Sequence, residues 1–242
     1  MNDLEKYFTS NTNRLIHKWQ HYFNVYDRHF SRYRGTDVHV LEFGVSEGGS
    51  LQMWKEYFGE RCKIYGVDIN PNCKDLEEDR IKIFIGDQED REFLRSLVKE
   101  MPRIDILIDD GGHRMRQQIN TFEELFPHIE DDGVYLCEDM HTSYTKGWGG
   151  GGYKRKGTFA EYSKNFIDYI NAWHSQSSKL NVSDFTKTAR SLHYYDSILV
   201  IEKDVVEKPF HLKTGVPKVK HYIPPRNKFK DVVNKLKSFI GY

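Results

Sequence analysis

The segment Ile104-Asp-Ile-Leu-Ile-Asp109-Asp110-Gly-Gly-His113 is a short apolar run that ends in two carboxylates, two glycines and a histidine. A second carboxylate pair, Glu138-Asp139, comes twenty-eight positions after Asp110 and also follows an apolar run directly. Short apolar runs of this kind are typical of buried parallel strands. Ligands of an open α/β sheet bind at the carboxyl ends of its strands. The sequence therefore predicts a metal site at the ends of these two strands.

Apolar runs and helical stretches alternate through most of the chain. The runs predict strands at 38–43, 63–68, 81–86, 104–109 and 134–138. The stretches between them predict helices at 50–57, 90–100 and 114–126. Repeated strand–helix units indicate a Rossmann-like, doubly wound and mostly parallel sheet with right-handed crossovers. A further helix is expected at 159–173, and the segment 189–202 predicts two more strands, an antiparallel edge that completes a seven-stranded sheet.

Both ends of the chain lie outside this pattern. Aromatic and apolar residues recur at helical spacing over 13–33, so we expect an amphipathic helix there that packs on the sheet or on a partner subunit. Residues 203–242 hold ten Lys or Arg against three Asp or Glu, and their last part predicts a basic amphipathic helix with an apolar face. Such a helix either packs on its own domain or lies on an anionic membrane surface or a partner.

Composition restricts the class of protein. With 242 residues and 38% hydrophobic content, the chain can bury one sizeable core. It has neither a run of eighteen apolar residues nor a basic stretch leading into an apolar one, so we expect no membrane span, no signal peptide and a cytoplasmic location. The three cysteines lack C-x-x-C spacing, which argues against disulfides and a structural zinc site. The acidic body without a nucleic-acid motif argues against nucleic-acid binding.

A glycine-rich turn follows the first predicted strand. The sequence Leu41-Glu42-Phe-Gly44-Val-Ser-Glu47-Gly48-Gly49-Ser50 opens the first helix of the sheet, where glycines let a ligand approach the backbone closely. Its spacing departs from G-x-G-x-x-G, which counts against NAD, the main rival ligand. Asp68 ends the second strand and suits ribose hydroxyls, while Asp87-Gln88 ends the third and suits an adenine amine. The alternative is that Asp68 and Asp87 merely begin loops.

With these motifs the chain resembles the class I S-adenosylmethionine-dependent methyltransferases. The resemblance implies a cofactor-binding methyltransferase domain at 36–204, preceded by a helical cap at 1–35 and followed by a basic extension at 205–242. It also implies a set of residues that contact S-adenosylmethionine. These residues are Glu42, Gly44, Glu47, Gly48, Ser50, Asp68, Asp87, Gln88 and Asp109.

Activation of a sugar hydroxyl requires a metal ion, a base, or both, because its proton leaves only at high pH. Carboxylate oxygens suit Mg²⁺ or a similar divalent cation. Adjacent residues that leave a strand point in opposite directions, so only one of Asp109 and Asp110 can face such an ion. A histidine titrates near neutral pH and therefore suits a general base.

The pattern of 109–113 with 138–144 also resembles the metal-dependent sugar O-methyltransferases of macrolide biosynthesis. That resemblance implies that Asp110, Glu138 and Asp139 bind the metal and that His113 is the general base. His141, Tyr144 and Trp148 are candidates for substrate contacts, and the glycine-rich segment 147–153 is a candidate for a mobile lid. The alternative for these side chains is that they are surface residues without a ligand, and the alternative for the glycine-rich segment is that it is a plain spacer.

The sequence thus predicts an S-adenosylmethionine- and Mg²⁺-dependent O-methyltransferase whose substrate is a small molecule or glycan with a sugar hydroxyl. One rival is a metal enzyme of the cephalosporin-hydroxylase type, whose two-histidine, one-carboxylate iron site would need His113 or His141 as a ligand. Another is a binding module that keeps the cofactor pocket without catalysis. The acceptor remains open, and so does assembly into a homo-oligomer.

Overall fold

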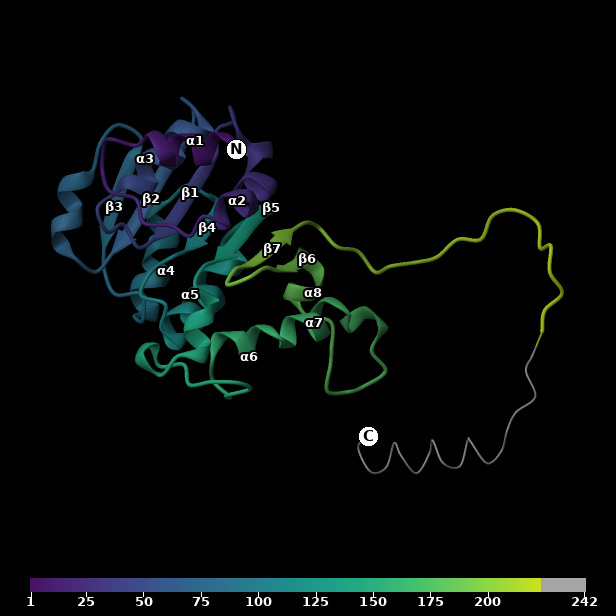
Figure 1. Ribbon diagram of the computed structural model, residues 1–242. Coiled ribbons are helices and arrows are strands. Elements are labelled where there is room, and N and C mark those ends of the chain that lie inside the picture. Colours follow the sequence, from purple (N-terminus) through teal and green to yellow (C-terminus); the bar gives the residue numbers. More distant parts are fainter. Residues whose placement is uncertain (223–242) are drawn as a thin grey trace. The chain divides into compact units, whose positions relative to one another are not determined.

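The structure is a computed structural model that describes residues 1–222, and its centre is one seven-stranded sheet with the order β3-β2-β1-β4-β5-β7-β6 (Figure 1). The strands are β1 (His39–Phe43), β2 (Lys63–Asp68), β3 (Ile81–Ile85), β4 (Ile104–Asp109), β5 (Ile129–Cys137), β6 (Ala189–Tyr194) and β7 (Leu199–Lys203). Strands β1 to β5 pair in parallel, whereas β7 runs antiparallel to both β5 and β6. The predicted doubly wound sheet with an antiparallel edge is confirmed.

Helices cover both faces of this sheet. They are α1 (Asp3–Ser10), α2 (Tyr22–Phe30), α3 (Gly49–Phe58), α4 (Arg91–Glu100), α5 (Met115–Leu125), α6 (Phe159–Ser163), α7 (Asn165–Ile170) and α8 (Asp184–Thr188). Alternate residues of each strand pack into two separate hydrophobic cores, because successive side chains of a strand point to opposite faces of the sheet. Val40 and Ile106 pack with α1, α2 and α3, while Leu41 and Leu107 pack with α4 to α7. The helix predicted at 159–173 is interrupted, since α6 and α7 meet at Lys164.

The strand order reverses between β1 and β4, and such a reversal opens a crevice beyond the carboxyl ends of the strands. Gly44 lies at this point. Its φ is +90°, and a Cβ atom there would lie 2.1 Å from the carbonyl oxygen of Asp110. Only glycine therefore lets the chain leave β1 so close to the end of β4.

The single helix predicted at 13–33 is wrong in its first half. Helix α2 begins at Tyr22, and residues 11–21, here called the strap, contain no helix. Leu15 and Trp19 contributed to the helical spacing, yet they are 69% and 55% exposed. The strap packs instead against the start of α3, where a Cβ on Gly49 would lie 2.3 Å from the carbonyl oxygen of Leu15. Tertiary contacts thus override the helical pattern of the strap.

The chain divides into two units, Met1–Lys208 and Pro209–Tyr242. Residues 1–35, predicted as a separate cap, belong to the first unit. The basic helix predicted near the end of the chain lies outside the described residues. Over residues 1–222, no helix combines the length and the apolar character that crossing a membrane requires.

Candidate active site

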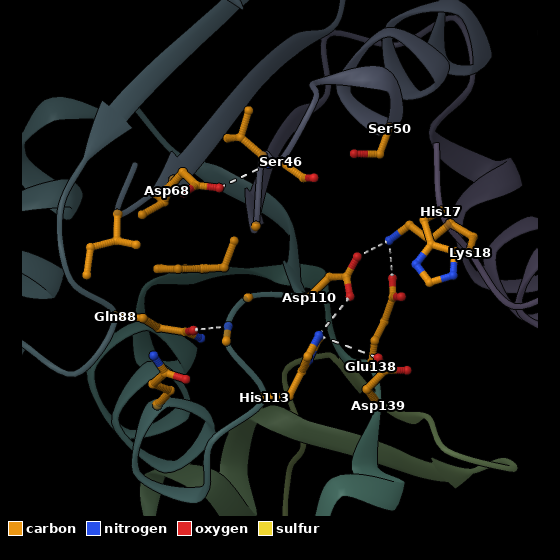
Figure 2. Close-up of a pocket in the computed structure, with 18 of the residues that line it drawn as sticks. His17, Lys18, Ser46, Ser50, Asp68, Gln88, Asp110, His113, Glu138 and Asp139 are labelled. Atoms are coloured by element: carbon orange, nitrogen blue, oxygen red, sulfur yellow. Dashed lines mark hydrogen bonds and ion pairs between the residues drawn. The ribbon is translucent and has the colours of Figure 1, made fainter. Parts of the chain in front are cut away.

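A cavity of about 380 Å³ lies at the carboxyl ends of the parallel strands, next to the reversal in strand order (Figure 2). Loops after β1, β2, β3, β4 and β5 line it, and the strap contributes residues 15–19. The cavity has two halves. Asp68 and Gln88 lie on one side, and His113, Glu138 and Lys18 lie on the other.

The first half contains predicted cofactor residues. Asp68 ends β2, and its carboxylate accepts backbone hydrogen bonds from Ser46 (3.0 Å) and Asn70 (2.9 Å). Ser46 has a φ of +50°, a strained value for a residue with a side chain. These contacts fix the carboxylate of Asp68 at the cavity wall. A contact of this carboxylate with ribose hydroxyls stays a prediction.

The predicted cofactor residues divide into two groups. Five line the cavity, namely Gly44, Ser50, Asp68, Asp87 and Gln88. The other four do not, namely Glu42, Glu47, Gly48 and Asp109. Glu47 is exposed, and Glu42 is buried behind the wall, where it accepts a 2.8 Å hydrogen bond from the Ser50 hydroxyl. None of these four residues lines the cavity, and their contact with the cofactor stays a prediction.

Asp109 and Asp110 point in opposite directions, and only Asp110 faces the cavity. Asp109 is fully buried, and its Oδ1 accepts a 2.6 Å hydrogen bond from Gln88 Nε2. Burial raises the pKa of Asp109 to about 7. Asp109 thus positions Gln88, whose Oε1 accepts a hydrogen bond from the backbone of Gly112 at 3.1 Å.

The second half gathers the predicted metal ligands and the predicted base. His113 Nε2 lies 3.4 Å from Asp139 Oδ2 and 3.8 Å from Asp110 Oδ1. One ligand atom from each of these three residues lies within 4.8 Å of the other two, so they could hold a metal ion together. His113 and Asp139 both have a positive φ, +52° and +53°. Backbone strain of this kind is concentrated at functional sites.

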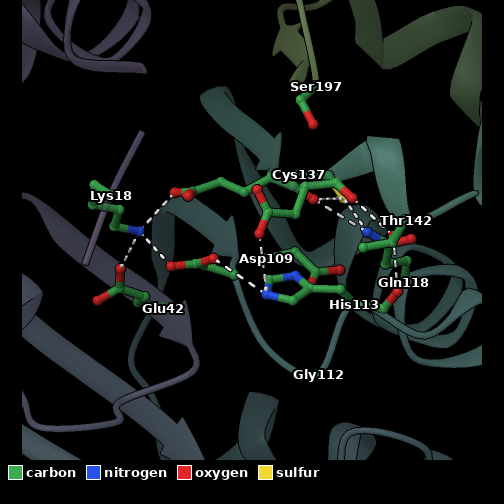
Figure 3. Close-up of polar contacts among 12 residues, drawn as sticks. Lys18, Glu42, Asp109, Gly112, His113, Gln118, Cys137, Thr142 and Ser197 are labelled. Carbon is green, nitrogen blue, oxygen red and sulfur yellow. Dashed lines mark hydrogen bonds and ion pairs between the residues drawn. The ribbon is translucent and has the colours of Figure 1, made fainter. Parts of the chain in front are cut away.

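Glu138 also lines the cavity, but its carboxylate is directed toward a residue that the sequence did not single out. Lys18, from the strap, forms ion pairs with Glu138 Oε1 (2.9 Å), Glu42 Oε1 (3.5 Å) and Asp110 Oδ2 (Figure 3). Burial alone would lower the pKa of Lys18, but these carboxylates outweigh burial and hold that pKa well above its usual range. The ammonium group is therefore a fixed positive charge beside the predicted metal ligands.

Two tyrosines of α2 reach the same carboxylates. The Tyr26 hydroxyl donates a 2.7 Å hydrogen bond to Glu138 Oε1, and the Tyr22 hydroxyl donates one of 2.7 Å to Asp139 Oδ1. Lys18 pairs with Oδ2 of Asp110, and Tyr22 bonds to Oδ1 of Asp139. The other oxygen of each carboxylate, Asp110 Oδ1 and Asp139 Oδ2, faces His113. Anionic oxygens gathered in this way fit a hard divalent cation.

The residues predicted for substrate contacts lie outside the cavity lining. Tyr144 and Trp148 are about half exposed, and the ring of Trp148 meets the ring of His113 edge to face at 5.8 Å. His141 Nδ1 lies 2.5 Å from Ser197 Oγ. His141 Nδ1 also lies 3.9 Å from Asp139 Oδ1, but among the described residues the cluster that could hold a metal contains one histidine, His113. An iron site of the cephalosporin-hydroxylase type would need two histidines and one carboxylate.

The glycine-rich segment 147–153 makes definite backbone contacts in the structure. The amide of Gly151 donates a 3.1 Å hydrogen bond to Ser143, and a Cβ on Gly150 would lie 2.1 Å from the carbonyl oxygen of Thr142. The segment thus packs on the short helix η4 (Met140–Tyr144), which follows the predicted ligand Asp139. Its role as a lid stays a prediction.

A second cluster of potential metal ligands joins His29, His193 and Glu202 behind the sheet edge. Its members already satisfy one another. His29 Nδ1 lies 2.9 Å from Glu202, and His29 Nε2 lies 2.9 Å from the Tyr195 hydroxyl. His193 Nε2 lies 2.9 Å from Ser191 Oγ. These hydrogen bonds connect α2 to the β6–β7 pair, so the cluster has a structural role.

The known proteins that this chain resembles are methyltransferases. The family model described as a methyltransferase domain matches residues 41–140. The mycinamicin VI 2''-O-methyltransferase of Micromonospora griseorubida is 38% identical over 188 residues, which are 74% of this chain and 47% of that protein. The demethylmacrocin O-methyltransferase of Streptomyces fradiae is 36% identical over 204 residues, 79% of this chain and 51% of that protein.

A solved structure of the methyltransferase MycE from the mycinamycin biosynthetic pathway, in complex with Mg, SAH and mycinamycin VI, aligns with a TM-score of 0.72 and 32% identity. The alignment covers 96% of this chain and 58% of that one. Residues 41–140 thus match a methyltransferase domain, and the sheet has the Rossmann-like methyltransferase fold of MycE. The chain is similar to macrolide sugar O-methyltransferases, and it spans about half the length of the curated relatives that it matches.

Proposed function

We propose that this chain is an S-adenosylmethionine-dependent, divalent-metal-assisted O-methyltransferase that acts on a hydroxyl of a sugar or of a glycosylated small molecule. One observation carries the proposal. Asp110, Asp139 and His113 converge within 4.8 Å at the edge of a cavity whose opposite side presents Asp68. The groups proposed to activate the acceptor and the carboxylate proposed to bind the cofactor's ribose thus line one cavity. We place the activity in the cytoplasm, as the sequence predicts.

The residues that line the cavity fit both S-adenosylmethionine and a divalent ion. The cavity volume of about 380 Å³ lies within the usual range for small-molecule sites, and its glycine-lined wall allows close approach of a ligand. Asp110, Glu138 and Asp139 supply the oxygen ligands that Mg²⁺ prefers. When bound, the divalent ion would hold an acceptor oxygen and lower the pKa of the hydroxyl.

The chain's own residues then perform the proton chemistry. His113 Nε2 faces the carboxylates at the rim, where it can take the proton of the acceptor hydroxyl as the oxygen bonds to the methyl group. S-adenosylmethionine, which Asp68 and Gln88 would help to hold, would supply the methyl group, and the methyl–sulfur bonding pair would stay on its sulfur. Trp148 lies against the His113 ring and offers an aromatic face on the side where a sugar would enter.

The proposal is tested with the full chain. Calorimetry should show binding of S-adenosylhomocysteine and of Mn²⁺, and Asp139→Asn should weaken only the binding of Mn²⁺. Mycinamicin VI and demethylmacrocin serve as trial acceptors, with methylated product detected by mass spectrometry. Turnover should stop with EDTA and return with Mg²⁺. Failure to bind either ligand, or turnover that is insensitive to the chelator, would contradict the proposal.

A further inference from the structure

We propose that Lys18 is a tethered cation that neutralises the carboxylate cluster when no divalent ion is bound and competes with that ion for Glu138 and Asp110. The inference rests on the metal-dependent function proposed above and deepens it. It assigns a role to a residue that no sequence motif indicated, and the role concerns how readily the site takes up metal.

The position of Lys18 is the first support. Its side chain is 3% exposed, and its ammonium group lies among three carboxylates that come from β1, the end of β4 and the end of β5 (Figure 3). Two of these carboxylates, Asp110 and Glu138, are among the three predicted metal ligands. The ammonium group therefore contacts carboxylates that a divalent ion would also bind.

The charge balance is the second support. Glu42 and Glu138 have side chains that are 0% and 1% exposed, and a buried carboxylate without a partner is strongly unfavourable. Across residues 1–222, Lys18 is the only lysine or arginine that pairs with Glu42, Asp110, Glu138 or Asp139. Without it the empty site would hold these carboxylates together with no fixed positive charge.

The same charge opposes a metal ion. An ammonium group and a divalent cation repel each other at the short distances of one carboxylate cluster, and weak screening in a buried site makes the repulsion large. A lysine can withdraw because its charge sits at the end of a flexible four-carbon stem. Lys18 comes from the irregular strap and lines the cavity, so its ammonium group can move away from the carboxylates toward the open side of the cavity.

The first test compares Mn²⁺ affinities by calorimetry on the full chain after removal of metal with a chelator. Mn²⁺ takes the same oxygen ligands as Mg²⁺. Lys18→Met keeps the length of the side chain and removes its charge, so we expect Mn²⁺ to bind at least about tenfold more tightly. Lys18→Arg keeps the charge and should bind no more tightly than the wild type.

The outcomes separate this inference from the proposed function. If the wild type binds Mn²⁺ and Lys18→Met gains no affinity, the inference is overturned and the metal site stands. If neither the wild type nor Lys18→Met binds Mn²⁺, the inference about Lys18 and the proposed metal-dependent function are both overturned. Thermal unfolding of each variant establishes that it is folded under the conditions of the titration.

A second test uses the wild type alone and does not depend on how the variants fold. Reductive methylation followed by mass spectrometry reports the accessibility of each lysine amine. Lys18 should be protected without metal and severalfold more reactive with Mn²⁺. Lys203 is an internal control, because it is also buried but its ammonium group bonds to the carbonyls of Phe126 and Ile129. Reactivity of Lys18 that does not rise with Mn²⁺ would overturn the inference.

Discussion

The hydroxyl of Tyr22 donates a 2.7 Å hydrogen bond to Asp139 Oδ1 and so joins helix α2 to the carboxyl end of β5. Tyr26, one turn further along the helix, does the same for Glu138. Groups that orient metal ligands from outside the coordination shell typically change metal affinity by 10- to 100-fold when they are removed. Helix α2 therefore belongs to the candidate active site although none of its residues lines the cavity.

Tyr22→Phe should weaken Mn²⁺ binding by about tenfold, because Asp139 loses the hydrogen bond that fixes its orientation. Stability should fall by about 1.5–3 kcal/mol, the usual range for a hydrogen bond to a charged group. Tyr57→Phe is the matched control, since Tyr57 donates a 2.8 Å hydrogen bond to Asp27, which lies outside the cavity lining. It should lose similar stability in urea unfolding while its Mn²⁺ affinity stays unchanged. Equal Mn²⁺ affinities in all three proteins would refute the role of Tyr22.

His113→Gln should lower kcat by 10²-fold or more, the usual contribution of a general base, while the affinity for Mn²⁺ changes little. Steady-state kinetics and calorimetry on the same samples measure the two quantities. If Mn²⁺ affinity instead falls by more than about tenfold, the range expected when a metal ligand or its support is removed, His113 is a metal ligand rather than the base.

Asp68→Asn should weaken binding of S-adenosylhomocysteine by about tenfold or more, since hydrogen bonds to a charged group contribute about 1.5–3 kcal/mol. Calorimetry gives the affinity. Asp75→Asn serves as the control, because Asp75 is exposed and lies outside the cavity lining. Equal affinities for the two variants would remove Asp68 from the cofactor site.

Asp109 should make stability depend on pH. Its pKa is about 7 in the folded protein because of burial, against 3.8 for an ordinary aspartate. Between these values the folded state holds a proton that the unfolded state has lost, so stability falls as pH rises from about 4 to about 7. Below pH 4 Asp109 does not make stability depend on pH, and above pH 7 stability has fallen by the full amount that Asp109 causes. The total is a few kcal/mol, since one pKa unit corresponds to about 1.4 kcal/mol.

Asp109→Asn should therefore gain stability relative to the wild type as pH rises through that window. Urea unfolding at several pH values measures the difference. A difference between the two proteins that stays constant from pH 4 to pH 7 would show that Asp109 ionises normally in the folded state.

Gly44→Ala should be much more destabilising than Gly35→Ala. Both glycines have a positive φ, which costs alanine about 1–2 kcal/mol, but a Cβ at Gly35 meets nothing within 4 Å. At Gly44 the added Cβ would collide with the backbone of Asp110. The difference in unfolding free energy between the two variants isolates this collision, and similar values would show that the ends of β1 and β4 can move apart.

The sequence by itself determined the sheet and the chemical type of the site. Alternating strand and helix patterns predicted β1 to β4 to within one residue at each end, because buried parallel strands are apolar along their whole length. The end of β5 was also predicted to within one residue, but that strand begins at Ile129, five residues before the predicted start. The same strands delivered Asp68, Asp110, Glu138 and Asp139 to one edge, since parallel strands end on the same side. His113 was predicted from the family resemblance and from its position three residues after Asp110.

Only the tertiary structure decided which carboxylate oxygens are free and which positive charge balances them. Lys18 lies ninety-two positions before Asp110, so no local spacing could connect the two residues. The strap that carries Lys18 looked helical because Leu15 and Trp19 have helical spacing, but it is an irregular segment that packs on the start of α3 and places Lys18 among three carboxylates. Local patterns record which face of an element is apolar, whereas pairing of buried charges depends on contacts between residues that are distant in sequence.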